Sequence, residues 1–354
     1  MLLPLVAAAV SIAACTGTVG TAADDGPPAL GPDGATSEPG AMPGGAGSAA
    51  AGDAPGSAGT GGADVACADA SVDTGAAALR RLDRQEYASS LQQLFQLPAR
   101  PDVSTVPAEA ERDGFTVHTQ LQTLSAQHLR AYLEVATALA DALLADPTRT
   151  AAVVGCELAQ AGCLDDFVAR FGRLAFRRPL TAEERDGILQ AARANALDDN
   201  DRYRYAIEAL LVSPGFLYRP ELGAADGELY ALSGYELASR LSFGLLGRAP
   251  DDGLLQLAAD GALETPEGRA LAVDTLANDP AFHDFFLGFF EQWLGFHRLI
   301  VPKEPPADWS DSLLADMEAE TAAAVEQFAW GGPGFLDVLT TDQTQLTGSL
   351  ATFY

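Results

Sequence analysis

Two adjacent arginines form the motif in this sequence that is best suited to hold an anion. Arg177 and Arg178 stand before Pro179 and a helix start, and guanidinium groups beside a helix N-terminus can bind a carboxylate or phosphate. The same arginines could instead form structural ion pairs with nearby carboxylates, namely Asp165, Asp166 or Glu183. The structural role is favoured, and Arg177 and Arg178 are kept as candidate ligand-binding residues.

Arg240 and Asp251 are two weaker candidates for ligand binding. Arg240 follows Glu236 by four residues, a spacing that predicts a helix-stabilising ion pair of ~0.3–0.5 kcal/mol. Asp251 follows Pro250 and has the position of a helix N-cap, where a carboxylate accepts hydrogen bonds from backbone N–H groups. A metal-binding or catalytic carboxylate at Asp251 is the alternative. No catalytic residue is assigned from these patterns.

The cysteines and histidines predict a disulfide but no metal or haem site. Cys156 and Cys163 lie seven residues apart, so a local disulfide is expected in an oxidising compartment, and Cys67 is left over. No C-x-x-C-H haem motif occurs, and His118, His128, His283 and His297 show no metal-ligand spacing. Because glycine-rich phosphate and dinucleotide motifs are also missing from the sequence, no cofactor is predicted.

The start of the chain resembles a bacterial lipoprotein signal. Residues 1–14 are an apolar run that ends in Ala13-Ala14 and is followed by Cys15. The length of the run is typical of a signal-peptide core. Residues 1–15 are therefore predicted to be a signal peptide with its lipobox, and Cys15 is predicted to carry the lipid. No Lys or Arg precedes the run, so a plain secretory signal is the alternative. Either interpretation places the protein in the cell envelope or outside the cell.

Residues 16–75 are predicted to be a disordered linker. They are rich in Gly, Ala, Pro, Ser and Asp, and the first basic residue of the chain is Arg80. Such a segment cannot bury enough apolar area to offset the entropy lost on ordering. As a flexible coil it would hold the folded part roughly 40 Å from a membrane anchor.

From Ala76 onward, apolar residues recur at helical spacing, and alternating strand patterns are scarce. Helices are predicted over residues 83–97, 125–144, 163–175, 181–196, 201–211, 233–245, 251–259, 265–277, 281–300 and 310–328. Capping boxes at Thr181 and Ser233 support two of these starts, and Asp146-Pro147 is predicted to be a stop. The fold class is therefore predicted to be all-α, with many helices packed orthogonally or as in a bundle.

The segment 281–300 is the most apolar of these helices. Its polar residues fall on one narrow stripe that includes Asp284, Glu291 and Arg298, so most of its circumference is predicted to be buried. A membrane span is rejected because each charge would cost ~2.5–3.5 kcal/mol near the centre of a bilayer. The net charge of −28 disfavours binding to nucleic acid, whose phosphates would be repelled.

Three segments resemble domains of unknown function from exported proteins of planctomycetes and myxobacteria. RLDRQEYASSLQQLF (81–95) resembles the third "PSD" domain, FVARFGRLAFRRPLTAEE (167–184) the fifth, and YELASRLSFGLLGRAPDDGLLQLAADGAL (235–263) the fourth. The resemblance implies helical modules over residues 76–150, 151–222 and 223–354. Relatives usually continue into a second PSD and a cytochrome-type module, so a natural short form or a piece of a longer protein is expected.

Two functional hypotheses follow. The first is a lipid-anchored interaction or scaffold module of the envelope, with the membrane and other exported proteins as partners. The second is an envelope enzyme or redox-complex component acting on carbohydrate or a cytochrome-like partner. This hypothesis rests on the cytochrome-type modules that usually accompany the family's domains. The sequence does not choose a substrate for the second.

Overall fold

The computed structural model describes residues 78–354, apart from 118, 195, 227–228, 311, 331–336 and 338–339. The predicted signal peptide, the lipidation site Cys15, the linker 16–75 and Cys67 therefore lie outside the described residues. The side chains of residues 120 and 297 are also outside the description.

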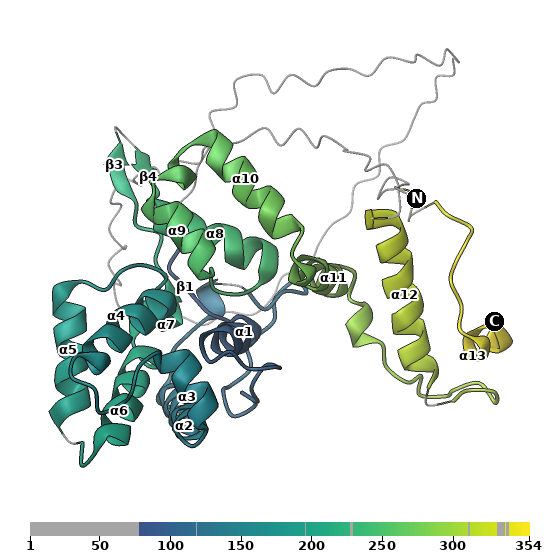
Figure 1. Ribbon diagram of the computed structural model, residues 1–354. Helices are drawn as coiled ribbons and strands as arrows, with labels where there is room; N and C mark the ends of the chain where they lie inside the picture. Colours follow the sequence, from purple (N-terminus) through teal and green to yellow (C-terminus); the bar gives the residue numbers. More distant parts are fainter. Residues whose placement is uncertain are drawn as a thin grey trace, which may run out of the picture.

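Helices dominate the described part of the chain, and the predicted all-α class is confirmed (Figure 1). The first half contains α1 (Arg84–Leu94), η1 (Thr119–Leu121), α2 (Ala126–Leu144), α3 (Pro147–Val154), α4 (Cys163–Phe176), α5 (Ala182–Ala194), α6 (Asp199–Leu211) and α7 (Pro214–Leu217). The second half contains α8 (Gly234–Leu246), α9 (Asp252–Ala259), η2 (Ala262–Glu264), α10 (Pro266–Ala277), α11 (Pro280–Leu294), η3 (Phe296–Arg298), α12 (Leu313–Trp330) and α13 (Gly348–Phe353).

Two short antiparallel strand pairs join segments of the chain. Strands β3 (Ala224–Asp226) and β4 (Leu229–Ala231) form a local pair, whereas β1 (Arg80–Arg81) pairs with the distant β2 (Tyr218–Arg219). In the β1–β2 register, Arg80 lies opposite Arg219. This pair fixes the start of α1 against the end of α7, and it positions the charged residues of the site described below.

Helix starts follow local capping signals. Asp83, Ser125 and Ser233 each close a capping box with the residue three positions later, and Thr265 caps α10 ahead of Pro266. The prediction that Asp146-Pro147 ends a helix is incomplete, because the same pair also begins α3. The Asp146 carboxylate accepts from the N–H groups of the next turn, and proline is tolerated at the first helical position.

The largest hydrophobic core combines helices from both sides of residue 150. Tyr87 and Leu91 of α1, Tyr132 of α2, Phe167 of α4 and Tyr203 of α6 belong to this single cluster. A second cluster lies between α8, α9, η2 and α10, and a third, small one joins α11 to α12. The body thus rests on two adjacent cores, and α12 attaches through a much thinner one.

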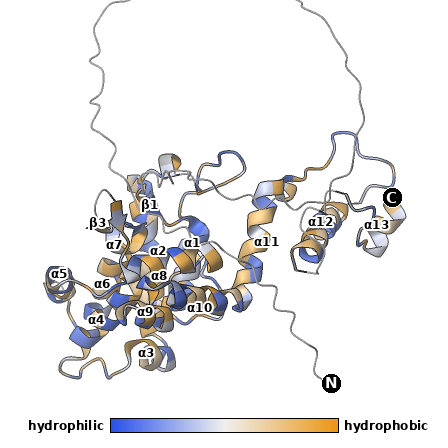
Figure 2. Ribbon diagram, turned by 90° about the horizontal axis from the view of Figure 1, so that it is seen from above, coloured by the Kyte–Doolittle hydropathy of each residue, from blue (hydrophilic) through white to orange (hydrophobic). Residues whose placement is uncertain are grey.

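The predicted burial of most of the 281–300 segment is wrong. Helix α11 ends at Leu294, because Gly295 adopts a left-handed conformation there, and Phe290 is its one buried residue. The helix runs between the body and the α12–α13 pair (Figures 1 and 2), and its Phe289, Trp293 and Leu294 side chains are 43–51% exposed. None of the helices in the described part combines the length and the apolarity needed to cross a bilayer.

Candidate functional site

Arg177 is a buried residue whose guanidinium is engaged by the protein's own backbone. It follows the last residue of α4 in a left-handed conformation, with φ at 59°, and its guanidinium donates to four backbone carbonyls, those of Ala175, Gly215, Phe216 and Tyr218, at 2.6–3.1 Å. Burial, with Arg219 as the next cause, lowers its pKa to about 9. Arg177 therefore ties the end of α4 to the α7–β2 turn.

Arg178 forms a two-pronged ion pair with Glu184. Its Nη1 and Nη2 atoms lie 2.9 and 2.8 Å from the two carboxylate oxygens. None of the three carboxylates predicted as partners is used, and Asp165 pairs with Arg193 instead. Glu184 is the N3 residue of α5, and its side chain turns back to cap the Thr181 N–H, so it reaches Arg178. The hydrogen bond from Arg178 lowers the Glu184 pKa to about 2.

Arg240 and Asp251 also have structural partners. The predicted Arg240–Glu236 pair is not formed: Arg240 pairs with Glu221, and Glu236 accepts from the N–H groups of Leu222, Gly223 and Ser233. Asp251 caps α9 by accepting from Leu254 N at 2.8 Å. Arg177 and Arg178 line one pocket of about 210 Å³ together with Glu236, Asp251 lines another, and Arg240 lines neither of these two. Cys156 and Cys163 are joined by a disulfide, with their Cα atoms 6.0 Å apart.

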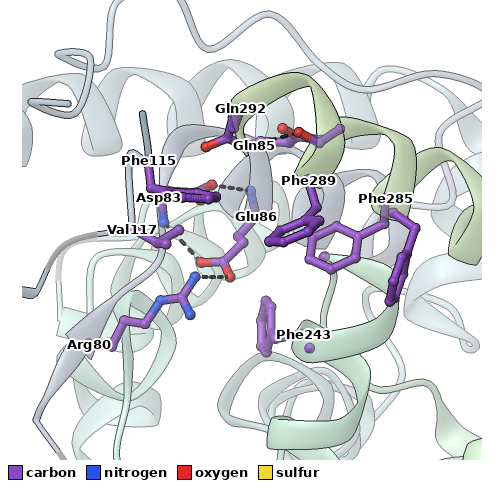
Figure 3. A pocket seen from close by; sticks show the side chains of 14 residues that line it. Arg80, Asp83, Gln85, Glu86, Phe115, Val117, Phe243, Phe285, Phe289 and Gln292 are labelled. Carbon is purple, nitrogen blue, oxygen red and sulfur yellow. Dashed lines mark hydrogen bonds and ion pairs between the residues drawn. The ribbon is translucent and has the colours of Figure 1, made fainter. Parts of the chain in front are cut away.

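A cleft of about 400 Å³ lies between the start of α1, the 115–117 segment, α8 and α11. Its wall is mainly aromatic, and its floor carries the charged side chains of Arg80 and Glu86, with Gln85 and Gln292 on the opposite side (Figure 3). The lining residues are Arg80, Asp83, Gln85, Glu86, Phe115, Val117, Phe243, Gly244, Gly247, Phe285, Phe286, Gly288, Phe289 and Gln292. A concave apolar cavity with a few polar groups is the usual form of a small-molecule site.

Glu86 is the buried acid of this cleft. Its Oε1 accepts from Arg80 Nη2 at 2.7 Å and from Arg219 Nη1 at 3.2 Å, and its Oε2 accepts from Asp83 N at 3.1 Å. The side chain is only 3% exposed. Burial raises the pKa of the Glu86 carboxyl to about 7, and Asp83 adds to the rise, whereas Arg80 and Arg219 oppose it. Glu86 is thus a carboxyl group that can change protonation state near neutral pH.

Aromatic rings surround the charged floor. Phe243 lies beneath Arg219, with 4.5 Å between the guanidinium carbon and the ring centre, which is a favourable cation–π distance. Phe289 of α11 stacks on Phe115 at 5.8 Å between ring centres. The rings of Phe243, Phe285 and Phe289 border the open part of the cleft beside Glu86 (Figure 3).

Three families of domains match this chain, and each is described as a protein of unknown function. PSD3 (DUF1587) matches residues 80–145, PSD5 (DUF1595) matches residues 163–221, and PSD4 (DUF1592) matches residues 232–354. The chain is a PSD3–PSD5–PSD4 protein. The resemblance seen in the sequence motifs is therefore confirmed, in the same order. No curated protein and no solved structure matches the chain.

The cleft lies where the three PSD domains meet. PSD3 contributes Arg80 and Glu86, PSD4 contributes Phe243 and the α11 residues, and PSD5 contributes Arg219 behind them. Contacts between the domains join these residues: Glu86 pairs with Arg219, Arg219 lies over Phe243, and Phe289 stacks on Phe115. Within the described residues, no group of three or more His, Cys, Asp or Glu side chains is arranged to hold a metal ion.

Sequence reasoning missed this cleft. The signal available was the capping box Asp83-x-x-Glu86 between arginines in the PSD3 motif RLDRQE. Capping glutamates are usually solvated, and only the pairing of β1 with β2 buries this one. The walls from α8 and α11 come from residues more than 150 positions later, which no local pattern connects to Glu86.

Five exposed apolar residues lie close together in the sequence, just beyond the cleft residues Phe289 and Gln292. They are Trp293 and Leu294 at the end of α11 with Leu299, Ile300 and Val301 after η3, and together they are called the α11 surface below. Trp293 is 51% exposed and Ile300 81% exposed. Contiguous exposed apolar side chains often mark an interaction site.

Proposed function

We propose that this PSD3–PSD5–PSD4 chain is an exported, lipid-anchored protein of the bacterial cell envelope that serves as an interaction module. The lipobox-like residues up to Cys15 and the acidic linker 16–75 support export and tethering. The helical body supplies the folded part that such a tether would hold away from the membrane surface.

The α11 surface is the observation that carries the interaction role. Its five apolar residues fall within nine positions, two at the end of α11 and three directly after η3. Burial of this surface by a partner would yield roughly 25 cal/mol per Å² of apolar area removed from water. The energy for association is therefore available at this surface without any change in the fold.

The expected partner is another exported envelope protein with an apolar patch and a basic surface. The chain carries a net charge of −28, with 49 acidic residues against 21 basic ones. Two copies of so acidic a chain repel each other, which disfavours self-association through the α11 surface. A basic partner would be attracted instead, and the attraction would weaken as salt screens it.

The interaction is tested with a photo-reactive amino acid in the full-length chain. Placed at Ile300, it should cross-link one basic envelope protein in intact cells, whereas at Leu197, which is 94% exposed on another part of the body, it should not. Trp293→Ser should reduce the Ile300 cross-link at least tenfold, and raising the salt concentration should reduce co-purification. Equal cross-linking from both positions, or a product that is only a second copy of the chain, would refute the proposal.

The anchor has a separate test. Growth with labelled palmitate should label the wild-type chain and leave Cys15→Ala unlabelled, and the wild type should sediment with membranes. Equal labelling of the two chains, or recovery of the wild type in the cytosol with its first residues attached, would contradict lipid anchoring and export.

An envelope enzyme is the second candidate, and the observation that favours it is the Glu86 pKa of about 7 in a cleft. A carboxyl with that pKa is suited to general acid–base catalysis, including attack on a carbohydrate. However, all three hydrogen bonds to Glu86 come from protein groups, so its lone pairs are largely committed. Turnover of fluorogenic glycosides by the wild type and not by Glu86→Gln would support the enzyme; turnover by neither, or equally by both, would exclude Glu86 as its catalytic acid.

A further inference from the structure

We propose that the cleft at the junction of the three domains binds a flat aromatic ligand that carries one anionic group, and that Arg80 pairs with this group. The proposal concerns a small-molecule site and does not depend on export or on the α11 surface. It rests on the shape of the apolar wall, on glycines that keep the cleft open, and on an arginine of the cleft whose Nε has no hydrogen-bond partner among the described residues.

The apolar wall suits a flat ring. Phe243 from α8 and Phe285 and Phe289 from α11 present their rings to the same open space (Figure 3). Aromatic pairs gain about 0.5–1.5 kcal/mol beyond area burial when their rings stack with an offset or meet edge to face. A planar ligand can make such contacts with several of these rings at once, whereas a sugar or a flexible chain uses them less well.

Two helix glycines hold the cleft open from two sides. Gly244 lies within α8 and Gly288 within α11, and both line the cleft. A Cβ atom added at either position would meet no other heavy atom within 4 Å. Glycine within a helix lowers its stability by about 1 kcal/mol relative to alanine. Helix stability alone would therefore favour alanine at both positions. The space beside these glycines is consistent with room for a ligand.

Three arginines gather at or behind the cleft floor. Arg80 and Arg219 contact Glu86, and Arg177 lies behind with its guanidinium carbon 5.8 Å from the Phe243 ring centre. The acids beside them are Asp83 and Glu86, which line the cleft, and Glu221, whose Oε1 lies 4.0 Å from Arg219 Nη2. In addition, Arg80 Nε is buried without a hydrogen-bond partner in the described structure. Such an orphaned donor is costly, and an anionic ligand oxygen would satisfy it.

Binding of the anion would be linked to proton uptake by Glu86. The ligand's anionic group takes the place of Glu86 as the partner of Arg80, while Glu86 keeps Arg219 and the Asp83 N–H. Glu86 then accepts one proton from solvent, which leaves the net charge of the site unchanged after an anion enters. Because the pKa of Glu86 is raised to about 7, this proton uptake requires little free energy near neutral pH.

The test uses two fluorescent probes that share one ring system. 8-Anilinonaphthalene-1-sulfonate is a flat aromatic anion, and N-phenyl-1-naphthylamine is its uncharged parent. In titrations of the full-length chain, Gly288→Leu and Gly244→Leu should each weaken binding of the anion at least tenfold. Gly187→Leu is the matched control, because Gly187 lies in α5, away from the cleft, and its Cβ also meets nothing within 4 Å.

Charge recognition is tested at Arg80. Arg80→Gln should weaken binding of the sulfonate about tenfold and leave the affinity for N-phenyl-1-naphthylamine unchanged. In the wild type, the affinity for the sulfonate should fall as the pH rises from 7 to 9. Thermal melting of every variant checks folding, and the glycine variants keep the test valid should Arg80→Gln unfold.

Three results would overturn the proposal. If the glycine-to-leucine variants bind the sulfonate as the wild type does, the probe binds outside the cleft. If Trp293→Ser abolishes binding while Gly288→Leu does not, the probe binds at the α11 surface. If folded Arg80→Gln loses no affinity for the sulfonate relative to the uncharged parent, the site has no anionic preference. Failure of the Ile300 cross-link would leave all three results unaffected.

Discussion

Glu86 Oε1 lies 3.2 Å from Arg219 Nη1, although the two residues are 133 positions apart in the chain. Glu86 belongs to the PSD3 match and Arg219 to the PSD5 match, so this ion pair joins two domains. It is buried, and its residues also contact Arg80 and Phe243. One carboxyl group thereby connects helix capping, domain docking and the floor of the cleft.

The stability of the chain should fall as the pH rises from about 4.5 to about 7. The Glu86 pKa is near 4.5 in the unfolded chain and about 7 in the folded one, so the folded state binds more protons in this window. The Glu86 contribution to the free energy of unfolding therefore decreases by about 3 kcal/mol across it and is constant above pH 7. Urea unfolding at several pH values measures the change.

Glu86→Gln is the control for this pH dependence. Glutamine cannot titrate but keeps an oxygen that can accept from Arg80 or Asp83 N. The unfolding free energy of the wild type minus that of the variant should decrease as the pH rises from 4.5 to 7. The contributions of the other carboxyl groups are the same in both proteins and cancel in this difference. Parallel pH profiles would show that the carboxyl does not titrate in this window.

Replacing Arg177 should destabilise the protein by about 3 kcal/mol or more. Arg177→Met removes hydrogen bonds to four buried carbonyls and leaves them without donors. Arg177→Lys should not rescue the loss, because an ammonium group cannot reach the carbonyls as a planar fork does. Urea midpoints measure the effect.

The neighbouring arginine provides the comparison. Arg178→Ala removes a partly exposed pair with Glu184 and should cost about 1 kcal/mol or less, since solvent screens it. An Arg177→Met variant as stable as Arg178→Ala would contradict the interior role of Arg177.

Reduction of the Cys156–Cys163 disulfide should lower the free energy of unfolding by about 2–3 kcal/mol. The bond closes a short loop between α3 and α4, and this loss follows from the chain entropy that reappears in the unfolded state. Melting with and without dithiothreitol measures it. Cys156→Ser should melt at one temperature under both conditions, and a wild type equally insensitive to the reductant would mean that the bond adds no stability.

Local signals predicted most helix starts, since a cap is decided within four residues. The predicted helix starts at 125, 181, 233 and 265 coincide with caps at Ser125, Thr181, Ser233 and Thr265. Asp146-Pro147 was harder, because the same dipeptide can end one helix and begin the next. These features needed no knowledge of distant contacts.

Long-range contacts decided what the sequence could not predict. The β1–β2 pair brings Arg219 to the buried Glu86, and the apolar content of α11 does not reveal whether other elements cover this helix. Arg240 forms its ion pair with Glu221 and not with Glu236, whose carboxylate takes part in the capping box at Ser233. The cleft combines all of these effects, so its residues could not be found by spacing alone.

Amide hydrogen exchange should divide the chain into a stable body and a more labile α12. Helix α6 buries five of its thirteen residues in the main core, among them Tyr203, Ile207 and Leu211. Helix α12 has eighteen residues, of which Leu313, Val325 and Phe328 are buried, and it rests on the small third core. Local opening of α12 therefore exposes less apolar area than opening of α6.

Mass spectrometry of exchanging native protein should show α12 exchanging at least tenfold faster than α6, at neutral pH and without denaturant. Equal protection of the two helices would mean that α12 unfolds only with the whole body, and that the third core is stronger than its few side chains indicate.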